Sequence, residues 1–195
     1  MHDVTAFVLA GGRSTRMGAD KALLQWGNET LLHRALNLAG AVAEEVRIVG
    51  DATKFGGFTS AVVEDVYRDR GPLGGIHAAL SSTASDLNLM LGVDLPLMKS
   101  EFLAYLITQA RKSGAFVTVP NAGGGFQPLC AVYRREFASV AEESLRAAKN
   151  KIDRLFSKVS TRVIEEEELV RAGFSADMFR NVNTPEDLEQ AKAKA

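Results

Sequence analysis

The chain has 195 residues, of which 46% are hydrophobic and 24% are charged, and its formal net charge is -1. This length predicts a single domain over residues 1–195, and the composition excludes a disordered chain. The near-neutral charge argues against a general nucleic-acid binder, so any cationic site must be local.

Short apolar runs rich in branched residues predict strands in the first half of the chain. They are VTAFVL at 4–9, VRIV at 46–49, AVVE at 61–64 and NLMLGV at 88–93. Between them, apolar residues at helical spacing predict helices around 31–38 and 73–80. Because strands and helices alternate, we expect an α/β three-layer sandwich, with a central mostly parallel sheet in a Rossmann-like arrangement.

The alternation continues after Pro96. A helix is expected from about Ser100, which we expect to cap it, to Lys112. A strand AFVTVP at 115–120 then leads to the loop NAGGG and to a second apolar run, QPLCAVY, at 127–133.

The C-terminal part predicts further helices near 136–148 and 185–194. The second has Thr184 as its expected cap and Pro185 at its first position. The run EEEE at 165–168 is typical of a solvated helix start, where negative charge is favourable. No repeat, low-complexity segment or linker divides the chain.

Two features bear on the cellular environment. The N-terminus, MHDVTAFVLAGG, lacks the basic start and long apolar stretch of a signal peptide, and no segment approaches the roughly 18 apolar residues of a membrane-spanning helix. We therefore expect a cytoplasmic protein without membrane contact. The single cysteine, Cys130, excludes an internal disulfide, and its apolar surroundings are typical of an inert core thiol.

The loop after the first expected strand carries an unusual set of residues. Gly11 and Gly12 let the backbone approach a ligand closely, and Arg13, Arg16 and Lys21 add cations that match phosphate oxygens. In an open α/β sheet, ligands bind outside the carboxyl ends of the strands, where this loop lies. The pattern favours a polyphosphate site, and a solvated turn is the alternative.

Two common nucleotide-binding loops are excluded. The pattern GxGxxG does not occur after the first strand, and GxxxxGK[ST] fails because Gly18 is followed by Ala19, Asp20 and Lys21. A different class of phosphate-binding loop is required.

The segment LAGGRSTRMGADKALL at 9–24 resembles the LxGGxSxRMGxDK loop of small nucleotidyltransferases, most closely the MobA family of molybdenum cofactor guanylyltransferases. Four further segments are similar to that family in the same order. They are VVEDVYRDRGPLGGI at 62–76, GVDLPLM at 92–98, FQPLCAVYRR at 126–135 and NVNTPEDL at 181–188. The resemblance implies the nucleotide-diphospho-sugar transferase fold.

The resemblance also implies an activity, namely transfer of GMP from GTP to the terminal phosphate of molybdopterin with release of pyrophosphate. Arg16 and Lys21 would hold the phosphates, Asp94 would bind Mg²⁺, and all three would be catalytic. Asn181 and Asn183 are similar to a pair beside the active site of the family. The nucleotide-binding residues implied are Leu9, Ala10, Gly11, Gly12, Lys21, Asp65, Gly71, Gly75 and Asp94.

Elementary chemistry agrees with parts of this assignment. Mg²⁺ prefers one or two carboxylates together with phosphate oxygens and water, so Asp94 at a strand end is sufficient, although it could instead form a turn or cap a helix. Asp65 could likewise only solvate its turn. A phosphate monoester is mostly dianionic at neutral pH, so no strong general base is needed, and His33 and His77 are expected to be structural or exposed.

The glycines suggest a basis for nucleotide selectivity. Cytidylyl relatives commonly carry alanine at the position of Gly12, and a methyl group there would crowd a purine. We therefore expect Gly12→Ala to weaken GTP binding more than CTP binding, and equal losses for the two nucleotides would refute this explanation. Gly71, Gly74 and Gly75 in RGPLGG are interpreted as glycines that let the loop pass close to the base, with ordinary loop geometry as the alternative for all three, above all for Gly71.

The acceptor site is less defined in the sequence. NAGGGFQP could form a mobile loop over the second substrate, with its phosphate near Lys149, Lys151 and Arg154, although a solvated helix face is equally compatible. Two alternatives stay open. The chain could be a nucleotidyltransferase that makes the cytidylyl form of the cofactor or uses a sugar phosphate or phospholactate as its acceptor, or it could be a nucleotide-binding module without catalysis. Transient contacts with cofactor-biosynthesis proteins and molybdoenzymes are also expected.

Overall fold

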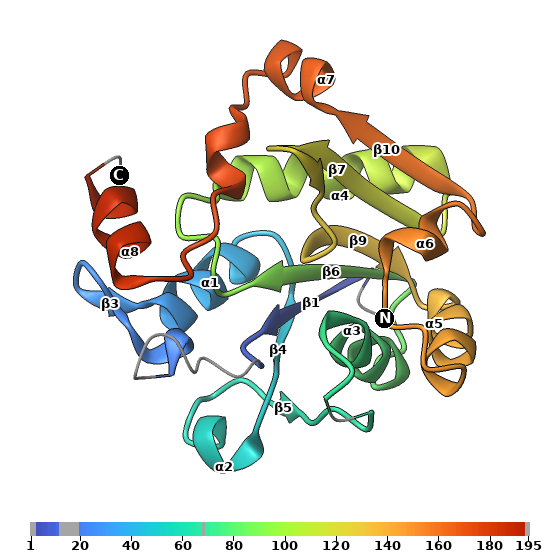
Figure 1. The fold of residues 1–195 in the computed structure, drawn as a ribbon, viewed down its shortest axis with the longest axis horizontal. Coiled ribbons are helices and arrows are strands. Elements are labelled where there is room, and N and C mark those ends of the chain that lie inside the picture. The colour runs from blue at the N-terminus through green and yellow to red at the C-terminus, as the bar shows by residue number, and fades with distance from the viewer. Residues whose placement is uncertain (1–2, 12–19, 68, 194–195) are drawn as a thin grey trace.

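The computed structural model describes residues 3–11, 20–67 and 69–193. Its central sheet has the strand order β10-β7-β9-β6-β1-β4-β5, with β8 paired to β7 (Figure 1). The strands are β1 (Val4–Leu9), β4 (Glu45–Val49), β5 (Val62–Val63), β6 (Leu87–Gly92), β7 (Val117–Ala122), β8 (Gly125–Phe126), β9 (Cys130–Arg134) and β10 (Thr161–Glu165). A separate two-stranded hairpin joins β2 (Gln25–Trp26) to β3 (Glu29–Thr30).

The strand directions confirm the expected mostly parallel sheet. Strand β1 runs parallel to both β4 and β6, β5 runs parallel to β4, and β10 runs parallel to β7. The exception is β9, which lies antiparallel between β6 and β7. The carboxyl ends of β1, β4 and β6 therefore meet at one edge, where the sequence predicted the ligand site.

Helices cover both faces of the sheet, as expected for three layers. On one face lie α1 (Leu31–Gly40) and α4 (Ser100–Ser113), and on the other lie α3 (Pro72–Ser81), α5 (Phe137–Arg146) and α6 (Asp153–Phe156) (Figure 1). Strand β1 is buried on both sides, because Ala6 and Val8 belong to the first core and Phe7 and Leu9 to the second. This explains its uninterrupted apolar sequence.

Helix starts agree with the sequence in one case and differ in another. The Thr184 side chain accepts a hydrogen bond from the Asp187 amide at 3.1 Å and begins α8 (Pro185–Lys192), as predicted. The expected cap Ser100 is instead the first residue of α4, and the N-cap position is Lys99, which makes no capping hydrogen bond. The Ser100 hydroxyl lies 3.4 Å from the Glu101 carboxylate, so it is directed toward a side chain instead of the first-turn amides.

The expected loop at 121–125 is the turn of a β-hairpin. Strand β7 ends at Ala122. Gly123 and Gly124 form the turn, with φ of 63° and 95°. Strand β8 then pairs with Asn121 and Ala122 of β7. The Gln127 side chain donates a hydrogen bond to the Ala122 carbonyl at 2.8 Å and ties the returning strand to the first. The segment is a β-hairpin turn and not an open loop, because glycines with positive φ also serve tight turns. Its contact with the second substrate stays a prediction.

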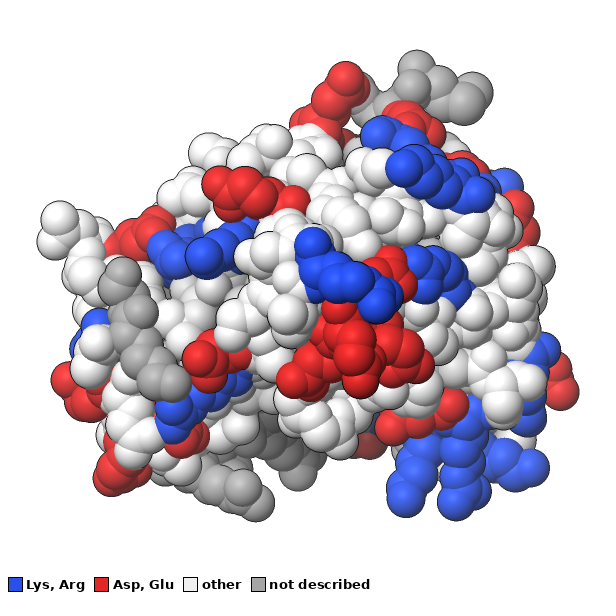
Figure 2. All heavy atoms as spheres, turned by 90° about the horizontal axis from the view of Figure 1, so that it is seen from above, with Lys and Arg blue, Asp and Glu red and all other residues white. Residues whose placement is uncertain are grey.

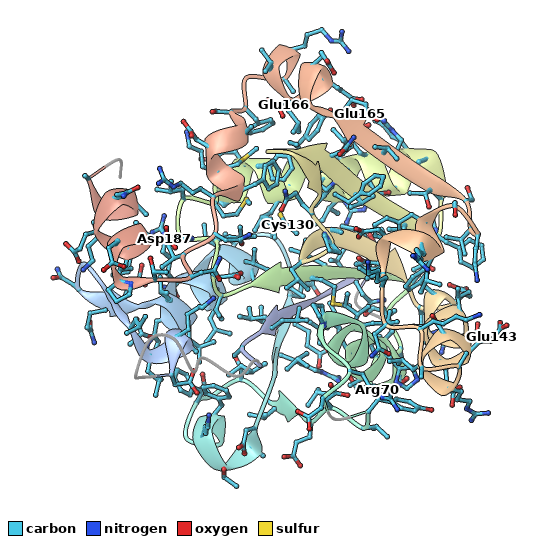
Figure 3. The ribbon with its side chains drawn as sticks, in the orientation of Figure 1. Arg70, Cys130, Glu143, Glu165, Glu166 and Asp187 are labelled. Atoms are coloured by element: carbon cyan, nitrogen blue, oxygen red, sulfur yellow. The ribbon has the colours of Figure 1, made fainter. Side chains whose placement is uncertain are left out.

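The glutamates at 165–168 begin a helix, α7 (Glu166–Arg171), but only in part face solvent. Glu168 forms an ion pair with Arg162 and accepts a hydrogen bond from Tyr105 at 2.8 Å. Glu165 and Glu166 lie near the tip of the molecule (Figure 3). Seen from that side, acidic side chains gather near the middle of the face with basic side chains directly beside them, and a further group of basic side chains lies at the lower right (Figure 2).

Cys130 lies inside the molecule, as predicted, at the start of β9 (Figure 3). Its thiol is fully buried, with the Met98 sulfur 3.9 Å away. Burial raises the pKa of the thiol far above its usual value, so the reactive thiolate does not form at neutral pH.

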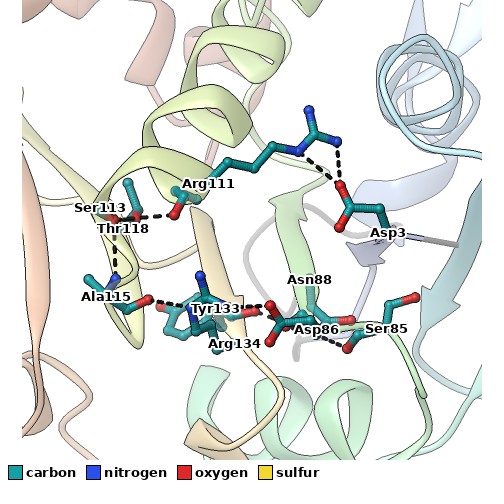
Figure 4. A network of polar contacts seen from close by, with 11 residues as sticks. Asp3, Ser85, Asp86, Asn88, Arg111, Ser113, Ala115, Thr118, Tyr133 and Arg134 are labelled. Carbon is teal, nitrogen blue, oxygen red and sulfur yellow. Dashed lines mark hydrogen bonds and ion pairs between the residues drawn. The ribbon is translucent and has the colours of Figure 1, made fainter.

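Ion pairs hold the amino ends of the strands, opposite the predicted site. Asp3 pairs with Arg111 of α4 at 2.7 Å, and Asp86, just before β6, pairs with Arg134 of β9 (Figure 4). Arg134 also donates to the Ala115 carbonyl at 3.2 Å. These contacts offer matched controls for substitutions at the carboxyl ends. No helix in the part of the chain that the structure describes is long and apolar enough to cross a membrane.

The C-terminal segment packs in a small core of its own. Val182, Leu188 and Ala191 contact Trp26 and Leu31, so α8 is held against the β2–β3 hairpin (Figure 1). The remaining short elements are η1 (Lys21–Leu23), α2 (Ala52–Phe55) and η2 (Ala176–Phe179). This packing brings the last helix to the edge where β1 and β6 end.

Candidate active site

A cavity of about 830 Å³ opens at the carboxyl ends of β1 and β4. Its wall combines the end of β1, the segment after β4, the loop after β5 and the start of α3. Six of the predicted nucleotide-binding residues line it: Leu9, Ala10, Gly11, Asp65, Gly71 and Gly75. The predicted residues Gly12 and Arg16 lie outside the described residues.

A cluster of polar side chains stands beside this cavity. The Lys21 ammonium donates a hydrogen bond to the Asn183 side-chain oxygen at 2.8 Å and lies 3.6 Å from the Asp94 carboxylate. Only 18% of the Lys21 side chain and 22% of the Asp94 side chain are exposed, so their attraction is less screened than at an open surface. Three predicted residues from distant segments thus meet at one point.

Asp94 is positioned by a close fit to its neighbours. A Cβ on Gly92 would lie 2.6 Å from the Asp94 carboxylate and 3.4 Å from the Leu129 Cβ, so only glycine leaves room for Asp94 here. The Asp94 carbonyl accepts a hydrogen bond from the Val182 amide at 2.9 Å. Because Leu129 also lines the cavity, Asp94 stands at the cavity's margin.

The second asparagine of the predicted pair is placed differently. Asn181 is exposed, and its side chain forms no hydrogen bond within the described part of the chain. Asn183, by contrast, is held by the capping box of α8, in which the Asp187 carboxylate accepts hydrogen bonds from the Asn183 and Thr184 amides at 3.0 Å each. The structure therefore brings Asn183 to the cluster and leaves Asn181 at the surface.

We expect this capping carboxylate to make the α8 segment acid-sensitive. The Asn183 amide, followed by the Thr184 contacts, holds the pKa of Asp187 (Figure 3) below its usual value. A lowered native pKa contributes stability at pH values above the unfolded pKa of about 4. That contribution is lost as the pH falls through the native pKa. The free energy of unfolding of wild type should exceed that of Asp187→Asn at pH 6, and the difference should shrink toward pH 2.5. A difference that stays constant over this range would contradict the assignment.

The loop after β5 is fixed by Asp65 and a glycine beneath it. Asp65 accepts a hydrogen bond from the Tyr67 amide at 2.8 Å, so it both forms a turn and lines the cavity. A Cβ on Gly74 would lie 2.5 Å from the Asp65 carboxylate and 2.9 Å from the Tyr67 carbonyl. Because Gly74 has no side chain, the loop after β5 can pack closely against α3.

We expect Gly74→Ala to displace the Asp65 loop. The Tyr67 backbone cannot yield as a flexible side chain would, so the substitution should lower stability by about 1–3 kcal/mol, as overpacking does, and should weaken nucleotide binding. Thermal unfolding and equilibrium titration with GTP would measure the two effects. Gly27→Ala is a poor control because Gly27 has φ of 59°, whereas Gly40→Ala is suitable because nothing lies within 4 Å of the added Cβ.

The other glycines of RGPLGG have distinct positions. Gly71 precedes α3 with φ of 66°, which suits glycine and favours the loop-geometry alternative as well as a ligand contact. Gly75 is buried, and a Cβ there would lie 3.3 Å from Leu9 and 3.4 Å from Val49. Gly75 therefore lets α3 pack closely on β1 and β4 at the floor of the cavity.

Several lining residues were not predicted from the sequence. Asp51 lies two residues after the end of β4, so the rule that placed the site at the strand ends could have found it. Asp20 could have been predicted because it adjoins Lys21 in the glycine loop motif. Nothing in the sequence around Lys54 indicates that it lines a ligand site. Among the described charged residues of the wall, Lys54 is the cation, and the carboxylates are Asp20, Asp51, Glu64, Asp65 and Asp69.

The histidines lie as predicted, away from the described cluster. His33 is exposed on α1 and contacts Thr30 at 3.0 Å, while His77 is buried in α3 with its ring against Tyr67. Lys149, Lys151 and Arg154 are exposed around the start of α6, which leaves their proposed contact with an acceptor phosphate a prediction.

Comparison with known proteins identifies the family. The sequence pattern of the MobA-like NTP transferase domain matches residues 6–163. The chain belongs to the MobA-like NTP transferase family.

Relatives in this family cover nearly the whole chain. A protein named "Probable molybdenum cofactor guanylyltransferase" from Pelotomaculum thermopropionicum is 39% identical over 100% of this chain and 95% of its own length. "Molybdenum cofactor guanylyltransferase" from Syntrophotalea carbinolica is 34% identical over 95% of this chain and 89% of its own length.

Solved structures agree with the fold expected for the MobA-like family. The crystal structure of molybdopterin-guanine dinucleotide biosynthesis protein A from Archaeoglobus fulgidus superposes with a TM-score of 0.86 at 25% identity, covering 97% of both chains. A CMP:2-keto-3-deoxy-manno-octonic acid synthetase complexed with CTP shares the fold alone, with a TM-score of 0.71 at 13% identity, 98% of this chain and 96% of its own being covered. The nucleotidyltransferase fold predicted from the sequence is thereby confirmed.

Proposed function

We propose that this protein transfers GMP from GTP to the terminal phosphate of molybdopterin, forming the guanine dinucleotide cofactor and pyrophosphate. The observation that carries the proposal is the meeting of Lys21, Asp94 and Asn183 beside a cavity at the carboxyl ends of β1 and β4. The names of full-length relatives support the same reaction.

The chemistry of the site suits a divalent cation held mainly by substrate. Among the described residues, no group of three histidine, cysteine, aspartate or glutamate side chains could hold a metal ion. Asp94 offers a carboxylate directly beside the Lys21 ammonium, and Mg²⁺ commonly takes one or two carboxylates, with phosphate oxygens and water completing its shell. We therefore propose that Asp94 is the protein ligand of Mg²⁺. When bound, the ion would neutralise charge on the α-phosphate and the departing pyrophosphate.

The chain's own residues would align the reactants. In this proposal the Lys21 ammonium stays held by Asn183 and donates a further hydrogen bond to a nucleotide phosphate. The wall that includes Leu9 and Gly11 holds the nucleoside. An oxygen of the acceptor phosphate attacks the α-phosphorus, forming a P–O bond as the bond to pyrophosphate breaks. Because that oxygen is already ionised at neutral pH, no side chain has to remove a proton.

The reaction can be tested directly. Purified protein with MgGTP and molybdopterin, or the molybdate-loaded cofactor, should release one pyrophosphate for each guanine dinucleotide formed, and EDTA should stop both. Binding of GTP without release of pyrophosphate would identify a nucleotide-binding module instead of an enzyme. Turnover with CTP alone would refute the guanine assignment.

A further inference from the structure

One carboxylate, Asp20, connects two segments on either side of the cavity. Its Oδ1 accepts a hydrogen bond from the Ala22 amide at 3.2 Å and caps η1, the short helix that begins at Lys21. Its Oδ2 accepts a hydrogen bond from the Lys54 ammonium of α2 at 2.8 Å. The backbone that carries Lys21 is therefore tied to the segment that follows β4.

The two ends of this ion pair differ in exposure. Only 19% of the Asp20 side chain is exposed, against 51% for Lys54. Both residues line the cavity, and α2 itself is anchored by the buried ring of Phe55. Asp20 thus presents a fixed negative charge to the cavity wall, and Lys54 reaches it from the solvent side.

The surroundings make that charge matter for an anionic ligand. The other described ionisable groups of the wall are the carboxylates Asp51, Glu64, Asp65 and Asp69. The Asp20 carboxylate would repel a polyphosphate entering the cavity if no cation neutralised its charge. The hydrogen bond to Asp20 raises the pKa of Lys54, so the lysine stays charged at neutral pH.

We propose that Asp20 is a positioning residue for Lys21 and that its ion pair with Lys54 sets the affinity of the cavity for the nucleotide polyphosphate. The inference rests on the proposed function and separates two roles of one side chain. The capping oxygen fixes the backbone of Lys21 and therefore affects kcat. The paired oxygen is neutralised by Lys54 and therefore affects nucleotide binding.

The test compares Lys54→Met, Asp20→Asn, Asp20→Ala and the double variant Asp20→Asn/Lys54→Met. Asparagine keeps an oxygen that can cap η1 but carries no charge, whereas alanine removes both functions. The Kd of a GTP analogue with a methylene bridge between the α- and β-phosphates is measured by calorimetry, and kcat is measured by pyrophosphate release. Arg111→Met is the matched control, because it breaks an ion pair with Asp3 at the opposite edge of the sheet.

Lys54→Met should raise the Kd about fivefold, since it leaves Asp20 unneutralised beside the polyphosphate. Asp20→Asn should bind the analogue at least as tightly as wild type, and the double variant should return to within about twofold of it. The kcat values should rank the variants differently. The kcat of Asp20→Ala should be about tenfold lower than that of Asp20→Asn, because only alanine removes the cap of η1. Arg111→Met should change neither quantity.

Two results would overturn the proposal. A double variant that binds as weakly as Lys54→Met would show that Lys54 contacts the nucleotide itself. Equal kcat values for Asp20→Ala and Asp20→Asn would show that the cap does not position Lys21. Calorimetry keeps this test separate from the proposed reaction. Wild type that binds the analogue but releases no pyrophosphate from GTP in the presence of the acceptor refutes the reaction, while the Kd comparison still decides the role of the ion pair.

Discussion

Replacement of Asp94 by asparagine is expected to lower kcat by about three orders of magnitude, the loss of several kcal/mol of charge stabilisation. The shape of the side chain is kept, so Gly92 and Leu129 can pack around it as before. The negative charge is lost, and with it both the attraction to Lys21 at 3.6 Å and the ligand that we propose for Mg²⁺. Pyrophosphate release under saturating GTP measures the effect.

The matched control is Asp86→Asn at the other end of the same strand. Asp86 pairs with Arg134 just before β6 begins (Figure 4), so this change also removes one carboxylate and one ion pair. Thermal unfolding of both variants separates folding from catalysis. If Asp94→Asn keeps Mg²⁺-dependent turnover within tenfold of wild type, Asp94 is not the metal ligand.

Substitution of Lys21 by methionine is expected to have the second largest effect, a fall in kcat/KM of about a hundredfold or more, as for loss of a cation from the transition state. The aliphatic part of the side chain keeps its volume, but the ammonium that contacts Asn183 at 2.8 Å is removed. Asp94 then also loses its neighbouring positive charge. Steady-state kinetics with varied GTP would divide the loss between KM and kcat.

Asn183→Ala tests the same contact from its other side. It leaves Lys21 in place beside Asp94, so the loss in kcat/KM should be about tenfold, smaller than for Lys21→Met. Lys192→Met is the control on α8, because Lys192 pairs with Glu189 at 2.8 Å on the exposed side of that helix. A Lys21→Met enzyme that is as active as the Lys192→Met control would exclude Lys21 from the reaction.

The sequence allowed the central strands to be predicted because burial on both faces removes polar residues from them. Strands β1 and β6 are buried throughout, and their runs VTAFVL and LNLMLG stand out. The direction of β9 could not be predicted, since an apolar run does not reveal whether its partner is parallel. The hairpin turn at Gly123 was missed for a related reason, because glycine suits both open loops and tight turns.

The residues of the candidate site also fall into those that could be predicted from the sequence and those that could not. Asp94 and Asp65 could be predicted because each follows a strand at the ligand-binding edge, and the family resemblance pointed to Asn183. The pairing of Asp20 with Lys54 could not, since the two residues are 34 positions apart and neither local sequence indicates the other. The role of Gly92 also needed the structure, because the clash that it avoids depends on the rotamer of Asp94.

The link between Lys21 and Asn183 joins residues 162 positions apart, almost the full length of the chain. During synthesis, the lysine is therefore made 162 residues before its asparagine partner and before the helix that holds that partner. Contacts of such long sequence separation are costly to close. The lining residues in the described part of the chain extend to Leu129, so they are synthesised before Asn183. A nascent chain that has passed Leu129 but has not reached Asn183 therefore lacks the contact that fixes Lys21, so synthesis of the α8 segment is a late step in assembling the site.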